Sequence, residues 1–177
     1  MVALDARTGQ LKWHYQFTPN DAYDYDACWE LILADKTIDG KKRKVVMQMN
    51  RNGFLYVIDR TNGKLIAANA FVKQNWAERI DMVTGRPVLS DVAKRLIAGE
   101  KVELWPRTTG GKNWPPMAFN PRTGLLYFTR LDEGMMLWYN PKLLDYRPGQ
   151  RYTGAVTRRF HKTLGLACGT LRKRAPR

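Results

Sequence analysis

The chain has 177 residues, 44% of them hydrophobic, which is enough for the core of one ordinary globular domain. No run of about 18 apolar residues occurs, which excludes a membrane-spanning helix, and no signal peptide is expected at the start. The formal net charge of +14 is uneven, because residues 158–177 hold seven Lys or Arg and no acid. Cys28 and Cys168 are too few for a disulfide framework and match no zinc motif.

One pattern of apolar stretches and turns occurs three times along the chain. In each copy an apolar stretch is followed by Asp or Asn, by a glycine four positions later and by a second apolar stretch. An Asx side chain can bind the backbone of its own turn, and glycine supplies the positive φ that closes a hairpin. The copies are "VALDARTGQLKW" with Asp5 and Gly9, "YVIDRTNGKLIA" with Asp59 and Gly63, and "MAFNPRTGLLYF" with Asn120 and Gly124.

The spacing of the three copies indicates the fold class. They begin 54 and 61 residues apart, counted between Asp5, Asp59 and Asn120, which is typical of the four-stranded blades of a β-propeller. Further strands are expected at Leu31–Ala34, Lys44–Met49 and Phe54–Asp59, with turns at Asp39-Gly40 and Asn52-Gly53. Residues 71–116 are otherwise rich in loops, with one short helix around 91–98. We therefore predict an all-β fold, a partial propeller of two to three four-stranded antiparallel blades.

The predicted domain is incomplete. A propeller closes with typically four to eight blades, so we expect this chain to be a fragment of a longer protein or to assemble with a partner. We assign residues 1–157 to the partial propeller. Residues 158–177 are expected to be a basic tail, disordered or outside the fold, although such a tail can also bind nucleic acid or a membrane surface.

The first copy, Ala3-x-Asp5-x-x-x-Gly9-x-x-x-Trp13, resembles the tryptophan-docking motif of the eight-bladed quinoprotein alcohol dehydrogenases, which use pyrroloquinoline quinone (PQQ). The resemblance runs from about residue 2 to residue 157. It implies oxidation of a primary alcohol to an aldehyde by hydride transfer to PQQ, in the periplasm, with cytochrome c as electron acceptor and a homodimer left open. Further stretches that resemble this family, in the same order, are "KWHYQFTPNDAYDYDA", "RKVVMQMNRNGFLYVIDRTNGKLIAAN", "GGKNWPPMAFNPRTGLLYF" and "YRPGQRYTGAV".

Three acids, Asp21, Asp24 and Asp26, lie among aromatic residues, where charges are costly to bury unless they are paired or bind a metal. In an extended segment Asp24 and Asp26 would project to one face while Tyr25 packs the other way. The resemblance implies that Asp24 is the catalytic base and a metal ligand, and that Asp26 is the additional ligand of lanthanide-dependent members. A trivalent ion favours another anionic oxygen, with calcium as the alternative metal. Acids on a loop surface are the alternative to a site.

The resemblance also implies that Arg51 and Asn113 bind the cofactor and that Trp114 lines the same wall. The alternatives are an exposed turn arginine and an amide that caps its own turn. We expect Asp24, Asp26, Arg51 and Asn113 to point toward one region. The segments that supply the other metal ligands and the stacking Trp of the family are absent, so we expect no activity from this chain alone.

Two residues are expected to be structural. Trp13 should dock one blade against the next, and Cys28 should be a small buried apolar residue. The competing functions are a non-catalytic propeller scaffold that binds partners and, ranked last, a nucleic-acid binder, since no nucleic-acid motif is present.

Overall fold

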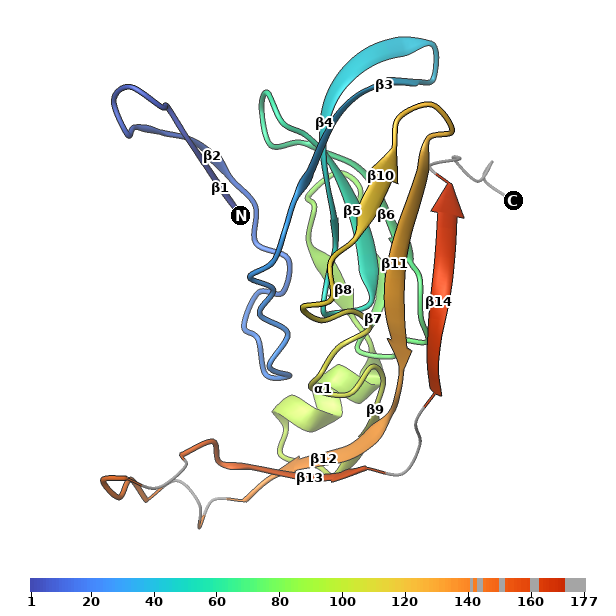
Figure 1. Ribbon diagram of the computed structural model, residues 1–177. Coiled ribbons are helices and arrows are strands. Elements are labelled where there is room, and N and C mark those ends of the chain that lie inside the picture. Colours follow the sequence, from blue (N-terminus) through green and yellow to red (C-terminus); the bar gives the residue numbers. More distant parts are fainter. Residues whose placement is uncertain (141, 143–144, 150–151, 160–162, 171–177) are drawn as a thin grey trace.

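The computed structural model describes residues 1–140, 142, 145–149, 152–159 and 163–170, and its sheets are all antiparallel (Figure 1). The described elements, in chain order, are β1 (Val2–Leu4), β2 (Leu11–His14), β3 (Ile32–Ile38), β4 (Lys41–Met49), β5 (Phe54–Asp59), β6 (Leu65–Ala70), β7 (Ala77–Ile80), β8 (Pro87–Leu89), α1 (Asp91–Ile97), β9 (Val102–Leu104), β10 (Ala118–Asn120), β11 (Leu125–Asp132), β12 (Met135–Tyr139), β13 (Ala155–Arg159) and β14 (Thr163–Thr170).

The central element is a four-stranded sheet in the order β3-β4-β5-β6, the arrangement expected of one blade. In the second half of β4, from Val45 to Met49, alternate side chains project to opposite faces of the sheet and are buried on both. Met47 packs in an apolar cluster with Leu126 and Phe128 of β11, whereas Val46 packs on the opposite side with Trp76. The sheet therefore separates two apolar cores. The strands predicted around residues 44–49 and 54–59 are confirmed, and β3 continues to Ile38.

The Asx-Gly turns have the conformation that the sequence predicts. Gly9, Gly63 and Gly124 have φ values of 70°, 76° and 72°, in the left-handed region that favours glycine. Each Asx side chain accepts a hydrogen bond from the backbone of its own turn, as between Thr61 N and Asp59 Oδ1 at 2.9 Å. A fourth copy, which was not predicted from the sequence, joins β7 to β8, where Gly85 N donates to Asp81 O at 2.8 Å.

The hairpin β1–β2 is fastened to two of these turns, which confirms the structural role expected of Trp13. The indole Nε1 of Trp13 donates to Arg60 O at 3.0 Å, and a Cβ on Gly63 would lie 2.9 Å from the Trp13 ring. The hydroxyl of Tyr15 donates to Gly85 O at 2.7 Å. Glycine at these turns therefore serves packing as well as backbone conformation.

Residues 71–116 contain more regular structure than expected. The predicted helix is confirmed as α1, whose N-cap Ser90 accepts from Ala93 N and whose Ala93 and Leu96 are buried. The prediction that the rest is loop is wrong for β7, β8 and β9, since three short strands lie there. They are too short, at three or four residues, to give a clear period in the sequence.

The C-terminal part of the chain also differs from expectation. Along its full length, β14 pairs with β11, from Thr163 opposite Asp132 to Thr170 opposite Leu125, so residues 163–170 are strand rather than disordered tail. Residues 160–162 and 171–177 of the expected tail lie outside the described residues, and the domain division at 157 stays a prediction. None of the described helices is long and apolar enough to cross a membrane.

Candidate functional site

The acid loop, residues 20–30, connects β2 to β3 and is held in place by its aromatic residues. Tyr23 and Tyr25 are buried and stack on each other with ring centroids 5.1 Å apart, and both contact the Trp76 ring. Asp24 has φ of 65°, so the segment is not extended there as assumed from the sequence. The expected alternation of exposure nevertheless holds, because Tyr25 is 1% exposed while the Asp24 and Asp26 side chains are 66% and 68% exposed.

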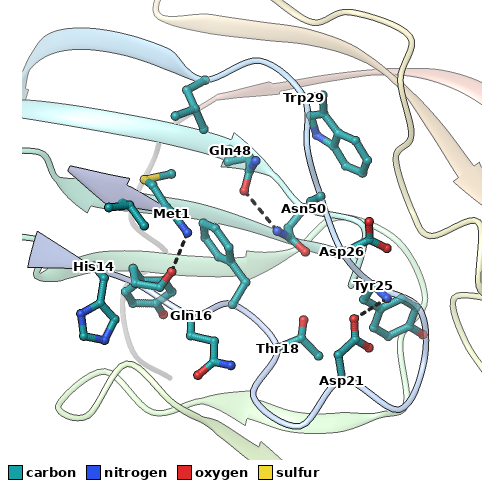
Figure 2. Close-up of a pocket in the computed structure, with 15 residues that line it drawn as sticks. Met1, His14, Gln16, Thr18, Asp21, Tyr25, Asp26, Trp29, Gln48 and Asn50 are labelled. Atoms are coloured by element: carbon teal, nitrogen blue, oxygen red, sulfur yellow. Dashed lines mark hydrogen bonds between the residues drawn. The ribbon is translucent and has the colours of Figure 1, made fainter. Parts of the chain in front are cut away.

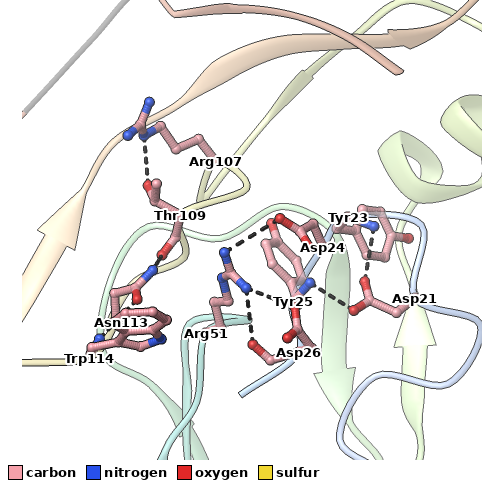
Figure 3. A network of polar contacts seen from close by, with 10 residues as sticks. All are labelled: Asp21, Tyr23, Asp24, Tyr25, Asp26, Arg51, Arg107, Thr109, Asn113 and Trp114. Carbon is pink, nitrogen blue, oxygen red and sulfur yellow. Dashed lines mark hydrogen bonds and ion pairs between the residues drawn. The ribbon is translucent and has the colours of Figure 1, made fainter. Parts of the chain in front are cut away.

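A single guanidinium joins the two exposed acids (Figure 3). Arg51 Nη1 lies 2.8 Å from Asp26 Oδ1, and Arg51 Nη2 lies 3.4 Å from Asp24 Oδ2. The Arg51 side chain is only 17% exposed and follows β4 in the turn to β5. Arg51 is therefore not the ordinary exposed turn arginine that the sequence left as an alternative. Its buried Nε has no hydrogen-bond partner within the described residues.

The third acid, Asp21, organises the loop rather than joining this cluster. Its Oδ1 accepts from Tyr23 N at 3.0 Å and its Oδ2 from Tyr25 N at 2.7 Å. Desolvation by the surrounding rings raises the pKa of Asp21, the charges of Asp24 and Asp26 raise it further, and the two backbone hydrogen bonds oppose the rise.

The loop that carries Asn113 reaches Arg51 through its backbone. Gly111 N donates to Arg51 O at 2.9 Å, and in the view of Figure 3 Arg51 lies between the two acids and Asn113. The Asn113 amide faces its own turn, donating to Thr109 O at 2.8 Å and accepting from Trp114 N at 2.9 Å. The alternative of an amide that caps its own turn thus describes Asn113 in this conformation. The Trp114 side chain is exposed.

Two ion pairs beside the site have no obvious signal in the sequence. Glu133 is buried and pairs with Arg107, and the fully buried Lys112 lies 3.1 Å from Glu30. Desolvation lowers the pKa of Lys112, while Glu30 opposes the shift. Each pair joins residues more than 20 positions apart, so only the tertiary fold reveals it. Cys28, expected to be buried, is exposed, and that expectation is wrong.

A pocket of about 580 Å³ opens beside the acid loop (Figure 2). The hairpin β1–β2 forms one side and the end of β4 the other, and Figure 2 shows Asp21 and Asp26 on its wall. The polar side chains that line it are His14, Gln16, Thr18, Asp21, Asp26, Gln48 and Asn50.

The acids fit part of a metal site. Carboxylate oxygens are the ligands that calcium and other hard cations prefer, and Asp24 and Asp26 present two of them at the surface. Within the described residues no group of three or more His, Cys, Asp or Glu could hold a metal ion. A metal bound by Asp24 and Asp26 would therefore need further ligands from elsewhere. The unpartnered Nε of Arg51 is a donor that a bound acceptor could satisfy.

Comparison with known proteins identifies similar chains. The family profile described as "Glucose/ethanol/alcohol dehydrogenase, beta-propeller domain" matches residues 1–69, which include the acid loop and Arg51. The chain is 50% identical over 127 residues to the quinohemoprotein alcohol dehydrogenase ADH IIB of Pseudomonas putida, covering 72% of this chain and 18% of that protein. It is 40% identical over 148 residues to the lanthanide-dependent methanol dehydrogenase of Methylacidiphilum fumariolicum, covering 84% of this chain and 24% of that protein.

The fold is similar as well. The solved structure of the quinohemoprotein alcohol dehydrogenase ADHIIG from Pseudomonas putida HK5 superposes with a TM-score of 0.82 at 42% identity, over 88% of this chain and 23% of that one. The chain thus spans about a fifth of the length of the relatives it matches. Together with the antiparallel sheets, this similarity confirms the predicted all-β, partial propeller fold.

Proposed function

The chain belongs to the PQQ-dependent alcohol dehydrogenase family, and on that premise we propose that it is a segment of an enzyme that oxidises a primary alcohol to an aldehyde. The observation that carries the proposal is the joint binding of Asp24 and Asp26 by Arg51. A non-catalytic scaffold would have no need for two exposed acids held by one largely buried guanidinium.

Each residue of this cluster has a proposed role. The chemistry that PQQ would supply when bound is acceptance of the hydride that leaves the alcohol carbon. Asp24, whose carboxylate is exposed, takes the hydroxyl proton as general base, which typically contributes 10²–10⁴-fold to a rate. Asp24 and Asp26 would hold a lanthanide ion, with calcium as the alternative. The fixed fork of the Arg51 guanidinium orients both carboxylates and has a donor left for an acceptor oxygen.

Asn113 and Trp114 are proposed as the outer wall of the cofactor site. The exposed Trp114 ring offers an apolar face that a planar ligand would cover. The Asn113 amide would have to exchange its bond to Thr109 O for one to the ligand. This pair is therefore the part of the proposed site that must rearrange most.

The proposal also covers the electron acceptor, the compartment and the oligomeric state of the full-length enzyme. Cytochrome c is the proposed electron acceptor, the periplasm the proposed compartment and a homodimer a further proposal for the full-length form. The 177-residue chain by itself is expected to show no turnover, because two acids are too few to complete the metal site.

A segment exchange tests the function. We would replace the matching segment of the lanthanide-dependent methanol dehydrogenase of Methylacidiphilum fumariolicum by residues 1–157 of this chain, and call the product the exchange enzyme. The measurement is dye-linked alcohol oxidation with PQQ and either lanthanum or calcium. We expect activity with lanthanum.

The other outcomes contradict the proposal in different ways. A folded exchange enzyme that binds PQQ but oxidises no alcohol would favour the non-catalytic scaffold. Activity with calcium that does not respond to lanthanum would show that Asp26 does not select the metal. Clear alcohol oxidation by the 177-residue chain would contradict the requirement for other segments.

A further inference from the structure

Lys112 is a buried cation outside the proposed set of metal and cofactor residues. Its side chain is fully buried, a position that a lysine rarely takes without partners. The Nζ atom lies 3.1 Å from Glu30 Oε1, donates to Asn113 O at 3.0 Å and lies 5.0 Å from the centroid of the Trp29 ring. The ammonium group of Lys112 thus interacts with a carboxylate, a carbonyl oxygen and the face of an aromatic ring.

The partners of Lys112 belong to the acid loop and are themselves anchored. Glu30 Oε1 also accepts from Met117 N at 2.7 Å, so one carboxylate holds both ends of the segment 112–117. Trp29 Nε1 donates to Met49 O at 3.0 Å, at the end of β4 and two residues before Arg51. The C-terminal end of the acid loop is therefore tied to two other segments.

The segment that carries Lys112 packs directly on Arg51. Besides the hydrogen bond from Gly111 N to Arg51 O, a Cβ on Gly110 would lie 2.1 Å from Arg51 Cγ, so only glycine permits this approach. The acid loop, the Arg51 turn and the segment 109–117 thus form a closed set of contacts. Lys112 and Glu30 make the ionic link in it.

We propose that the Lys112–Glu30 pair, covered by Trp29, is a positioning device that fixes the acid loop relative to the turn of Arg51. It acts through the backbone of residues 109–117 and touches neither Asp24 nor Asp26. Its geometric part is independent of the proposed function. Its consequence for a metal at Asp24 and Asp26 rests on that function.

Amide hydrogen exchange on the 177-residue chain tests the geometric part. In Lys112→Met, which keeps the length of the side chain but removes its charge, we expect exchange at Met117, Gly111 and Tyr25 to accelerate at least about tenfold. Amides in the middle of β5 should keep their rates. Lys112→Arg, which retains the charge, should fall between the two. Arg95→Met is the matched control, because its pair with Glu100 is exposed on both sides.

Faster exchange at Met117 alone, with Gly111 and Tyr25 unchanged, would overturn the proposal, because the pair would then support only its own loop. If Lys112→Met does not fold, Glu30→Gln decides, since it removes the charge of the pair with little change of shape. Exchange at Gly111 and Tyr25 should then accelerate. Unchanged rates there would overturn the proposal.

Terbium binding is a second measurement, because the two possible effects of Lys112→Met change the Tb³⁺ affinity in opposite directions. Removing the positive charge of Lys112 would, through the loss of Coulomb repulsion alone, tighten Tb³⁺ binding at Asp24 and Asp26. Loss of positioning should instead weaken it, by no more than the roughly 10- to 100-fold that losing a direct outer-shell partner costs, because the pair touches neither ligand. Tighter binding in Lys112→Met overturns the consequence for the metal. This measurement is made on the exchange enzyme, because a metal at Asp24 and Asp26 needs further ligands that the described residues of this chain do not supply. No terbium binding by the exchange enzyme would count against the proposed metal site, and the exchange rates of the 177-residue chain would still decide the positioning role.

Discussion

Two kinds of aspartate in this chain illustrate different ways of fixing a carboxylate. Asp59 is held by its own turn, where Thr61 N donates to Oδ1 at 2.9 Å. Asp26 is held by Arg51, which is 25 residues away, and its loop stays in place because Tyr23 and Tyr25 are buried. The first arrangement depends on a few consecutive residues, whereas the second forms only when segments that are distant in the sequence pack against each other. Asp26 therefore reaches the candidate site only through the packing of a distant arginine, whereas the main contacts of Asp59 are with its own turn.

Removing Asp26 should have the largest effect. In the exchange enzyme we expect Asp26→Ala to abolish lanthanide-dependent alcohol oxidation and to lower lanthanide affinity, because a trivalent ion loses an anionic oxygen. Dye-linked oxidation and a lanthanide titration measure the two effects. Asp59→Ala is the control for losing an acid, since Asp59 lies in a turn that the proposed site does not use. Full activity of Asp26→Ala would remove Asp26 from the metal site.

The variant Asp24→Asn should separate the proposed role of Asp24 as general base from its proposed role as metal ligand. The amide keeps an oxygen for the metal but cannot take a proton, so kcat of the exchange enzyme should fall about 10²–10⁴-fold. Lanthanide affinity should fall less than in Asp26→Ala. Equal losses of kcat and affinity in the two variants would show that Asp24 is only a ligand.

The same contrast explains what the sequence could predict. The turns at Gly9, Gly63 and Gly124 follow from local chemistry, and all three were predicted. The fourth, Asp81 to Gly85, has the same spacing, but the short strands around it gave no clear pattern. Its Asx residue and glycine have the same spacing as in the other three turns, so a search for that spacing alone, without the strands, could have identified it.

The candidate site was predictable only in part. The joining of Asp24 and Asp26 by Arg51 agrees with the expected convergence, which came from the family resemblance. The orientation of the Asn113 amide and the burial of Lys112 depend on how segment 109–117 packs on Arg51, which no local pattern encodes.

Turn glycines that look alike in sequence should differ in importance. Gly9 and Gly63 both have positive φ, but a Cβ at Gly9 meets nothing within 4 Å, whereas one at Gly63 meets the Trp13 ring. We expect Gly9→Ala to lower the free energy of unfolding by about 1–2 kcal/mol, the cost of positive φ. Gly63→Ala adds overpacking and should cost about 2–5 kcal/mol. Urea unfolding of the 177-residue chain measures both, and equal losses would contradict the docking of Trp13.

The smallest expected effect is a pH dependence of opposite sign at Asp81 and Asp21. Hydrogen bonds from the Thr84 backbone and hydroxyl lower the pKa of Asp81 below its ordinary 3.8. Its contribution to stability is therefore fully present above pH 3.8 and is lost as the pH falls through the lowered pKa. Desolvation raises the pKa of Asp21 above 3.8, so its contribution is fully present below pH 3.8 and is lost as the pH rises through the raised pKa.

Asp81→Asn and Asp21→Asn separate these contributions when each is compared with wild type by urea unfolding between about pH 3 and pH 7. The stability advantage of wild type over Asp81→Asn should grow with pH from below 3.8. Its advantage over Asp21→Asn should be largest at low pH and should shrink as the pH rises above 3.8, because ionising the desolvated Asp21 carboxyl costs free energy that a neutral Asn amide does not incur. If the stability difference between wild type and variant changes with pH in the same direction for both variants, the rings around Asp21 do not desolvate its carboxylate. The acid loop would then be no more desolvated than an ordinary turn.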